Sequence, residues 1–129
     1  MAKKPKGELT TRMLAMPSDT NPAGDIFGGW ILSQMDIAGN LVSKRIAKGR
    51  TVTVAVDSMN FHLPVFVGDT VCCYTQVKRI GRTSITIYVE AWVSRQYETR
   101  IIRVTEGNFT FVAVDDDREP RVIRKDDDD

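Results

Sequence analysis

The sequence predicts an α+β protein in which one long helix packs against an antiparallel sheet. Only one segment, from about residue 28 to residue 47, has the length and apolar character of a helix, and Gly49 ends it. The segments after it alternate polar and apolar residues, are rich in β-branched side chains and are separated by tight turns. No second helical segment lies between them, which excludes a parallel βαβ arrangement. A chain of 129 residues suits a single domain.

A polar arm and a long loop precede the helix. Residues 1–8 form the arm, and Leu9–Met16 carry a weak strand pattern. The next stretch, Met16–Gly29, is rich in turn-forming residues, so we expect it to deliver the chain to a helix over Gly28–Ala47. Basic residues near the end of that helix suit its dipole; they are Lys44, Arg45 and Lys48.

Strands fill the rest of the chain. Pro64 indicates a sheet edge or a bend, and Gly68-Asp69 form a turn. A two-residue hairpin at Gly81-Arg82 joins two long strands, and a bulge is predicted at Gly107-Asn108 in the last strand. The expected strands are 51–59 with its continuation 60–65, Asp69–Ile80, Thr83–Ser94 and Thr99–Val114, with a turn at Arg95–Glu98.

The single domain is expected to cover residues 1–129, with its folded part over about 9–118. The arm at 1–8 and the acidic tail at 119–129 should be flexible, because the tail ends in four aspartates that repel one another.

Composition argues against several classes of protein. The formal net charge of +1 gives no basic field for nucleic acid or an anionic membrane. No apolar run approaches the roughly 20 residues that span a bilayer, and the N-terminal residues lack the apolar region of a signal peptide. The two cysteines, Cys72 and Cys73, are adjacent and would point to opposite faces of a strand, which suits neither a disulfide nor a metal site. We therefore expect a cytoplasmic protein.

A carboxylate, Asp36, interrupts the apolar helix. The residues expected beside it on the helix surface are small or polar apart from one leucine, and so narrow a face would permit another backbone to approach; they are Gly29, Leu32, Ser33, Gly39, Asn40 and Ser43. Apolar residues occupy more than half of the circumference, so most of the helix should be buried; they are Trp30, Ile31, Met35, Ile37, Ala38, Leu41, Val42 and Ile46. Asp36 is then either a solvent-facing or serine-bonded residue, or a general base or nucleophile in a cleft.

Two glycines, Gly28 and Gly29, open the helix. Their backbone N–H groups have no intrahelical partner and no side chain to shield them, so together with the helix dipole they suit a carbonyl oxygen that gains negative charge. Glycines also serve tight turns, so the pair alone is a weak signal. With Asp36 two turns further on, the pattern favours acyl transfer or hydrolysis.

Three stretches resemble a known family. They are "LAMPSDTNPAGDIFGGWILSQMDIAG", "TVAVDSMNFHLPVFVGDTVCCY" and "GRTSITIYVEAWV", and the likeness runs from about Met13 to Asp115. The combination of GDIFGGW, QMD and VGDTV at this spacing resembles the YciA-type acyl-CoA thioesterases of the hotdog fold. The resemblance implies a curved antiparallel sheet around a central helix, and hydrolysis of acyl-CoA to a free acid and coenzyme A with broad tolerance of chain length.

The resemblance also implies roles for residues and an assembly. The catalytic aspartate of the family falls on Asp36, and the amides that polarise the substrate carbonyl fall on Gly28 and Gly29. An Asn or Asp that related thioesterases use before the glycines falls on Asp25. In the family, the carboxylate and the loop before the helix come from opposite subunits, so a homodimer is the active unit, and a trimer of dimers is common. Coenzyme A is part of the substrate, and no cofactor is implied.

Further residues are candidates for binding the coenzyme A moiety. Hydroxyl groups and an arginine close the long hairpin, where the family tends to hold the nucleotide; they are Arg82, Thr83 and Ser84. Ser58 and Asn60 fall where the pantetheine arm would run along a strand. Asn21, like Asp25, is either an ordinary loop residue or part of the site. Without the resemblance, Arg82, Thr83 and Ser84 are better explained as an exposed polar turn.

Other chemistries have less support. His62, the single histidine, is expected to pack structurally on a strand, and no Cys/His spacing indicates a metal site. No G-x-S-x-G motif supports a serine hydrolase. A non-catalytic acyl-CoA-binding or regulatory hotdog protein is the main alternative, although a pure binder gains nothing from Asp36. A hotdog hydratase is a second alternative, but it would need an Asp/His pair that His62 is badly placed to form.

Overall fold

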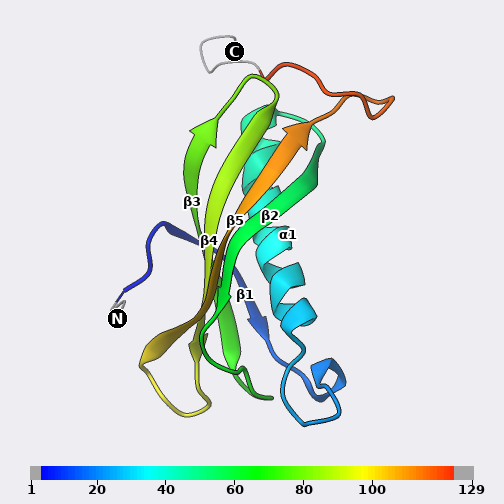
Figure 1. Cartoon of the computed structure of the whole chain (residues 1–129). Coiled ribbons are helices and arrows are strands. Elements are labelled where there is room, and N and C mark those ends of the chain that lie inside the picture. Colours follow the sequence, from blue (N-terminus) through cyan, green and yellow to red (C-terminus); the bar gives the residue numbers. More distant parts are fainter. Residues whose placement is uncertain (1–3, 124–129) are drawn as a thin grey trace.

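The computed structural model describes residues 4–123. Five strands form one sheet in the order β1-β3-β4-β5-β2, and every neighbouring pair is antiparallel. The long helix lies across one face of this sheet (Figure 1). The predicted α+β class is confirmed. The elements are β1 (Glu8–Leu14), a single 3-10 turn at Pro17–Asp19, α1 (Gly28–Ala47), β2 (Thr51–Phe61), β3 (Thr70–Ile80), β4 (Ser84–Ser94) and β5 (Ile101–Ala113).

The core lies between α1 and the sheet. Strand β4 is central, and every second side chain along it faces the helix and is buried; these are Ile85, Ile87, Val89, Ala91 and Val93. On the helix, Met35 and Ala38 are fully buried against them. Helix α1 ends after Ala47, where Lys48 adopts a left-handed conformation with φ of 55°.

The small residues of α1 do not form the face that we expected. Gly39 and Ser43 are buried against the chain's own sheet, and a Cβ at Gly39 would lie 2.8 Å from Cζ of Phe111. Ile37, which the pattern placed on the buried side, is instead 50% exposed. Gly39 therefore lets the helix approach β5 closely, and it does not present a contact face for another chain.

The bulge lies on the other strand of its pair. Gly107 pairs regularly with Val89 of β4, whereas the β2 residues Ser58 and Met59 together lie opposite Gly107. Ser58 has a φ of 54°, and a Cβ at Gly107 would lie 2.5 Å from Cε of Met59. The prediction of a bulge at Gly107-Asn108 was thus wrong in its strand: the glycine makes room for the bulge in β2.

Two further boundaries differ from the prediction. The β3–β4 turn is shifted by one residue, because Gly81 N donates to Ser84 O over 2.7 Å and so Arg82 and Thr83 form the turn. Strand β2 ends at Phe61, so Pro64 lies in the following loop.

The folded part extends beyond residues 9–118. Lys6 N donates to Oε1 of Glu90, and Ile123 is buried while its N–H donates to Arg82 O over 2.8 Å. Arg121 donates from Nη2 to Ala47 O over 2.7 Å, which ties the C-terminal segment to the end of α1. The buried side chain of Ile123 and the guanidinium of Arg121 thus attach residues 121–123 to the domain. The predicted flexibility of residues 1–3 and 124–129 lies outside the described residues.

Candidate active site

The loop before α1 is built around Asn21. Its Oδ1 accepts hydrogen bonds from Ala23 N at 2.9 Å and from Asp25 N at 3.1 Å, and its own N–H donates to Asp25 O at 2.7 Å. Gly24 completes the turn with a φ of 93°, which a residue with a Cβ rarely adopts. Asn21 therefore shapes the loop, as Asn does in Asx turns. Asp25 lies half-buried directly after this turn.

The start of α1 is open. No side chain caps the helix, and its first residues, Gly28 and Gly29, are exposed. A Cβ at Gly29 would have no atom within 4 Å, and one at Gly28 would meet only the Phe61 ring, at 3.5 Å. The first turn of the helix therefore carries no side-chain cap from the described residues, and its glycines leave the surface beside it uncovered.

Asp36 lies halfway along α1, on the side that faces β2. It is half-buried, and its Oδ1 accepts a 2.6 Å hydrogen bond from the Thr53 hydroxyl of β2. Asp36 is thus hydrogen-bonded to a threonine and not to a serine, and it keeps part of its surface in solvent. The carboxylate is held in one orientation at the edge of the sheet.

A polar seam continues from Asp36 toward the end of the helix. Asn40 Nδ2 donates to Thr51 O at 3.1 Å, and the Ser43 and Thr51 hydroxyls lie 2.6 Å apart. Thr53 and Thr51 were not among the predicted site residues, because the alternation of residues 51–59 indicates a strand but not which element packs beside it. The sequence does contain a signal for them, because the alternate residues Thr51, Thr53 and Ala55 are small or carry a hydroxyl, which suits packing against the polar side of the helix.

Asp36 and the helix start cannot act on one atom within a single chain. Eight residues separate Gly28 from Asp36. At about 1.5 Å per residue, this is about 12 Å along the helix axis. Strand β2, beside Asp36, is an edge of the sheet, and its outward valines are exposed; these are Val52, Val54 and Val56. An apolar edge strand of this kind is a surface that another chain can cover.

The candidate coenzyme A residues divide into two groups. Ser58 and Asn60 lie at the β2 bulge, where Asn60 Nδ2 donates to Ser58 O at 3.1 Å; the same strand ends at Phe61, beside the helix start. Arg82, Thr83 and Ser84 lie at the β3–β4 turn, at the end of the molecule where α1 ends (Figure 1). Within one chain, Ser58 and Asn60 therefore lie on the strand whose last residue, Phe61, is beside Gly28, whereas Arg82 lies at the opposite end.

His62 belongs to a polar network on the sheet face opposite α1. Its Nε2 lies 2.7 Å from Oε2 of Glu106, and the Tyr88 hydroxyl lies 2.7 Å from a carboxylate oxygen of both Glu106 and Glu90. Arg103 contacts both carboxylates at 3.3 Å. Burial disfavours the charge of Glu90 and of Glu106, but the donors around them outweigh it and lower the pKa of each. The network lies on the other face of the sheet from α1, which carries Asp36, and a structural role for His62 stays a prediction.

The described residues contain no group of three or more His, Cys, Asp or Glu side chains that could hold a metal ion. Cys72 and Cys73 are both buried and free, and burial raises the pKa of the Cys73 thiol to about 11. No helix of residues 4–123 is both long enough and apolar enough to cross a membrane.

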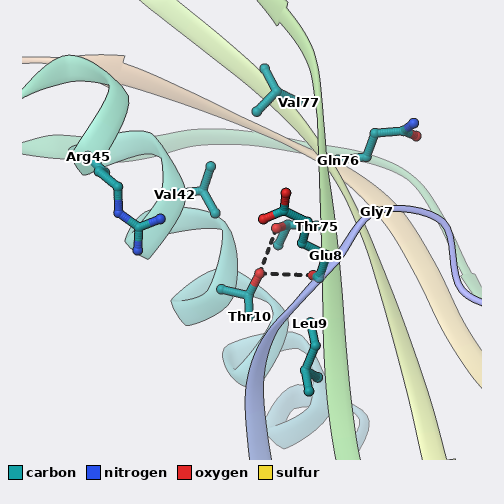
Figure 2. Close-up of a pocket in the computed structure, with 9 residues that line it drawn as sticks. All are labelled: Gly7, Glu8, Leu9, Thr10, Val42, Arg45, Thr75, Gln76 and Val77. Atoms are coloured by element: carbon teal, nitrogen blue, oxygen red, sulfur yellow. Dashed lines mark hydrogen bonds between the residues drawn. The ribbon is translucent and has the colours of Figure 1, made fainter.

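A groove of about 370 Å³ lies between α1 and the β1–β3 pair. Figure 2 shows Val42 and Arg45 reaching toward it from the helix, while the Thr10 and Thr75 hydroxyls meet across β1 and β3 at 2.6 Å. None of the predicted site residues lines this groove. It lies at the sheet edge opposite β2, so it is separate from the Asp36 site.

The fold and the site define a hotdog-type thioesterase, and comparison with known proteins agrees. The profile of the thioesterase superfamily matches residues 23–99. An acyl-CoA thioester hydrolase of Haemophilus influenzae, itself uncharacterized, is 57% identical over 121 residues, which are 92% of this chain and 79% of that protein. The acyl-CoA thioester hydrolase YciA of Salmonella typhimurium is 52% identical over 126 residues, 95% of each chain.

A solved structure shows the same architecture. The hexameric thioesterase of Yersinia pestis superposes with a TM-score of 0.91 at 54% identity, over 95% of this chain and 99% of that one. The chain therefore belongs to the thioesterase superfamily, within its YciA-type acyl-CoA thioester hydrolases.

Proposed function

We propose that this protein hydrolyses acyl-CoA thioesters, and that its active site forms between two copies of the chain. In each site, Asp36 of one copy acts on the thioester, while Gly28 and Gly29 of the other polarise its carbonyl. The observation that carries this proposal is that α1 holds two complementary groups about 12 Å apart along its axis. One is the Asp36 carboxylate, which Thr53 orients, and the other is the helix start, which no side chain caps. A second chain would bring the two groups together in one site.

The chemistry follows from these two groups. Asp36 takes a proton from water, the water oxygen bonds to the carbonyl carbon, and negative charge develops on the carbonyl oxygen. The amides of Gly28 and Gly29 stabilise that charge. The C–S bond then breaks, and the proton held by Asp36 goes to the thiolate, which gives coenzyme A and a free acid. Alternatively, Asp36 attacks the carbonyl carbon directly, and the C–S bond breaks to release coenzyme A as a thiolate, which takes a proton from solvent. Water then hydrolyses the resulting mixed anhydride to the free acid and regenerates the Asp36 carboxylate. Neither route requires a metal or a cofactor.

The assembly is part of the proposal. Edge strand β2, with its exposed valines, is the surface on which the second copy would lie. The Yersinia pestis relative is hexameric, which supports a hexamer for this chain, and we propose that the hexamer is a trimer of such dimers. Within one chain, the β3–β4 turn with Arg82 lies far from the helix start. In a dimer, this turn of one copy would approach the active site at the helix start of the other copy. We propose that Arg82, Thr83 and Ser84 bind coenzyme A phosphates there, with Ser58 and Asn60 along the pantetheine arm and Asp25 beside the carbonyl.

We also propose a cytoplasmic location, which the two free cysteines support. A non-catalytic acyl-CoA binder is the outcome to be distinguished from hydrolysis.

The test is thiol release from acetyl-, butyryl- and palmitoyl-CoA, followed with a thiol reagent, for the wild type and for Asp36→Asn. We expect the wild type to release coenzyme A and the variant to lose at least about a hundredfold in turnover while it still binds coenzyme A. Asn40→Asp, which adds a carboxylate one turn further along the same face, should not rescue Asp36→Asn. Absence of release from every chain length by the wild type would identify a binder instead, and near-normal turnover of Asp36→Asn would remove Asp36 from the mechanism.

A further inference from the structure

The loop before α1 is anchored to the segment between β2 and β3. At its beginning, Ala15 N donates to Asp69 O at 2.9 Å, and Gly68 N donates to Ala15 O at 3.0 Å. At its end, Ile26 N donates to Val65 O at 3.0 Å. Ala15, Ile26 and Val65 are all buried. Both ends of the loop therefore depend on where residues 65–69 lie.

Two charged side chains fix that segment. Asp69 is 2% exposed, and its Oδ2 accepts a 2.8 Å hydrogen bond from Phe66 N and an ion-paired hydrogen bond from Nη1 of Arg95. Nη2 of Arg95 donates to Pro64 O at 3.3 Å, and its guanidinium lies 4.7 Å from the centre of the Phe66 ring. Arg95 thus contacts residues 64, 66 and 69 at once, on both sides of the Val65 carbonyl.

A short series of contacts joins the Arg95–Asp69 ion pair to the proposed catalytic amides of Gly28 and Gly29. Val65 O holds Ile26 N, Ile26 precedes the N-cap Phe27, and the next two residues are Gly28 and Gly29. Phe27 N is held as well, by Asp19 O at 3.0 Å. A displacement of Val65 would move the first turn of α1, and a misplacement of about 1 Å at a site of charge development can cost about a hundredfold in rate.

We propose that Arg95 and Asp69 are positioning residues for the amides of Gly28 and Gly29, which they reach through Val65 and Ile26. The proposal rests on the proposed hydrolysis, but its structural half stands apart from activity. Neither side chain touches the substrate. The guanidinium fork matters because a single charge can pair with Asp69 but cannot also bind Pro64 O and cover the Phe66 ring.

The test compares Arg95→Met and Arg95→Lys with a matched change, Arg100→Met, at an exposed arginine nearby. Hydrogen–deuterium exchange is measured on the assembled protein for peptides that cover residues 20–31 and, as a reference, residues 38–47. We expect Arg95→Met to speed exchange of the Ile26, Phe27 and Ile31 amides by tenfold or more, to leave 38–47 unchanged and to lower kcat by about ten- to a hundredfold with KM within a factor of two. Arg95→Lys should fall between Arg95→Met and the wild type.

The outcomes are separable. Unchanged exchange at residues 26–31 in both Arg95 variants, or a kcat loss no larger than in Arg100→Met, would overturn the positioning role. If Arg95→Met fails to fold, Arg95→Lys carries the test, because it keeps a charge beside Asp69 and loses only the fork. If the wild type hydrolyses no thioester, the proposed function fails, and the exchange data alone decide whether Arg95 fixes the start of α1.

Discussion

The Thr53 hydroxyl of β2 donates a 2.6 Å hydrogen bond to Oδ1 of Asp36 on α1. This contact joins the middle of the helix to the edge strand, and Oδ2 makes no hydrogen bond to another residue of 4–123, so in the proposed mechanism it is the oxygen that accepts the proton. It also ties the orientation of the carboxylate to the strand on which a second copy of the chain is proposed to lie. Thr53 would thereby link Asp36 to the proposed subunit interface.

Replacing Thr53 should therefore impair turnover. Thr53→Val keeps the β-branched shape but removes the donor, and a hydrogen bond to a charged group contributes about 1.5–3 kcal/mol. We expect kcat to fall by about ten- to a hundredfold, whereas Thr53→Ser should stay near the wild type. Steady-state kinetics with butyryl-CoA measures both. Thr86→Val makes the same change on β4 and should have no effect; equal losses in Thr53→Val and Thr53→Ser would show that the hydroxyl is not the relevant group.

The shared site predicts complementation between two inactive variants. Asp36→Asn removes the carboxylate, and Gly29→Pro removes one amide donor at a position where an added side chain meets no atom within 4 Å. Proline is tolerated in the first turn of a helix, so the fold should survive. In a mixed dimer, one site carries both changes and the other carries neither.

Unfolding and refolding an equal mixture of the two variants should therefore restore up to about a quarter of wild-type activity, since half of the dimers are mixed and each has one intact site. Thiol release before and after mixing measures this. Each variant refolded alone is the control. A mixture that remains as inactive as its components would place Asp36 and Gly29 in the same chain's site.

The fold was predictable because its signals are local and periodic. The glycine pair, the helix length and the alternation of the strands each depend on a few neighbouring residues, so the element order and the α+β class follow from the sequence. The positions of Gly39 and Ile37 were not predictable. Which side of an apolar helix meets the sheet depends on long-range packing, and Gly39 faces Phe111, which is 72 residues away.

The candidate site shows the same division. Asp36 and Gly28-Gly29 stand out within one segment, whereas Thr53 becomes a site residue only when β2 is laid beside α1. Asn21 was ambiguous because an Asx turn and a ligand contact use the same side-chain oxygen. Ile123 was missed because the neighbouring aspartates dominate the composition of the tail, although a single buried isoleucine is enough to dock it.

The Glu90–Glu106 network predicts loss of stability in acid. The pKa of each carboxyl is lowered in the folded protein from the ordinary value of 4.5, so the unfolded chain binds more protons as the pH falls past that value. The stability that these groups contribute is present above about pH 4.5 and is lost as the pH falls toward the lowered values. Thermal unfolding between pH 7 and pH 3 should show this decline.

Glu90→Gln should reduce the decline and cost stability at neutral pH. Glu90 is fully buried and accepts hydrogen bonds from Lys6 N, from Trp92 Nε1 and from Arg103. Exchanging its charge for an amide should cost about 1–3 kcal/mol at pH 7, since charge-assisted hydrogen bonds are lost and an amide N–H is left facing donors. Glu119→Gln, at an exposed position, is the control. A Glu90→Gln variant whose Tm falls as steeply with acid as the wild type would exclude Glu90 as the cause.

The close approach of α1 to β5 gives the last prediction. A Cβ at Gly39 would lie 2.8 Å from Cζ and 2.9 Å from Cε1 of Phe111, a ring that is fully buried and cannot move aside. Overpacking of this kind costs about 1–3 kcal/mol, and the better helix propensity of alanine offsets up to about 1 kcal/mol. We expect Gly39→Ala to lower the free energy of unfolding in urea, whereas Gly29→Ala, where the added Cβ meets nothing, should not lower it. If Gly39→Ala were as stable as the wild type, the helix would have room to shift away from the sheet, and the orientation of Asp36 toward Thr53 would be less firmly fixed than the contact at Phe111 implies.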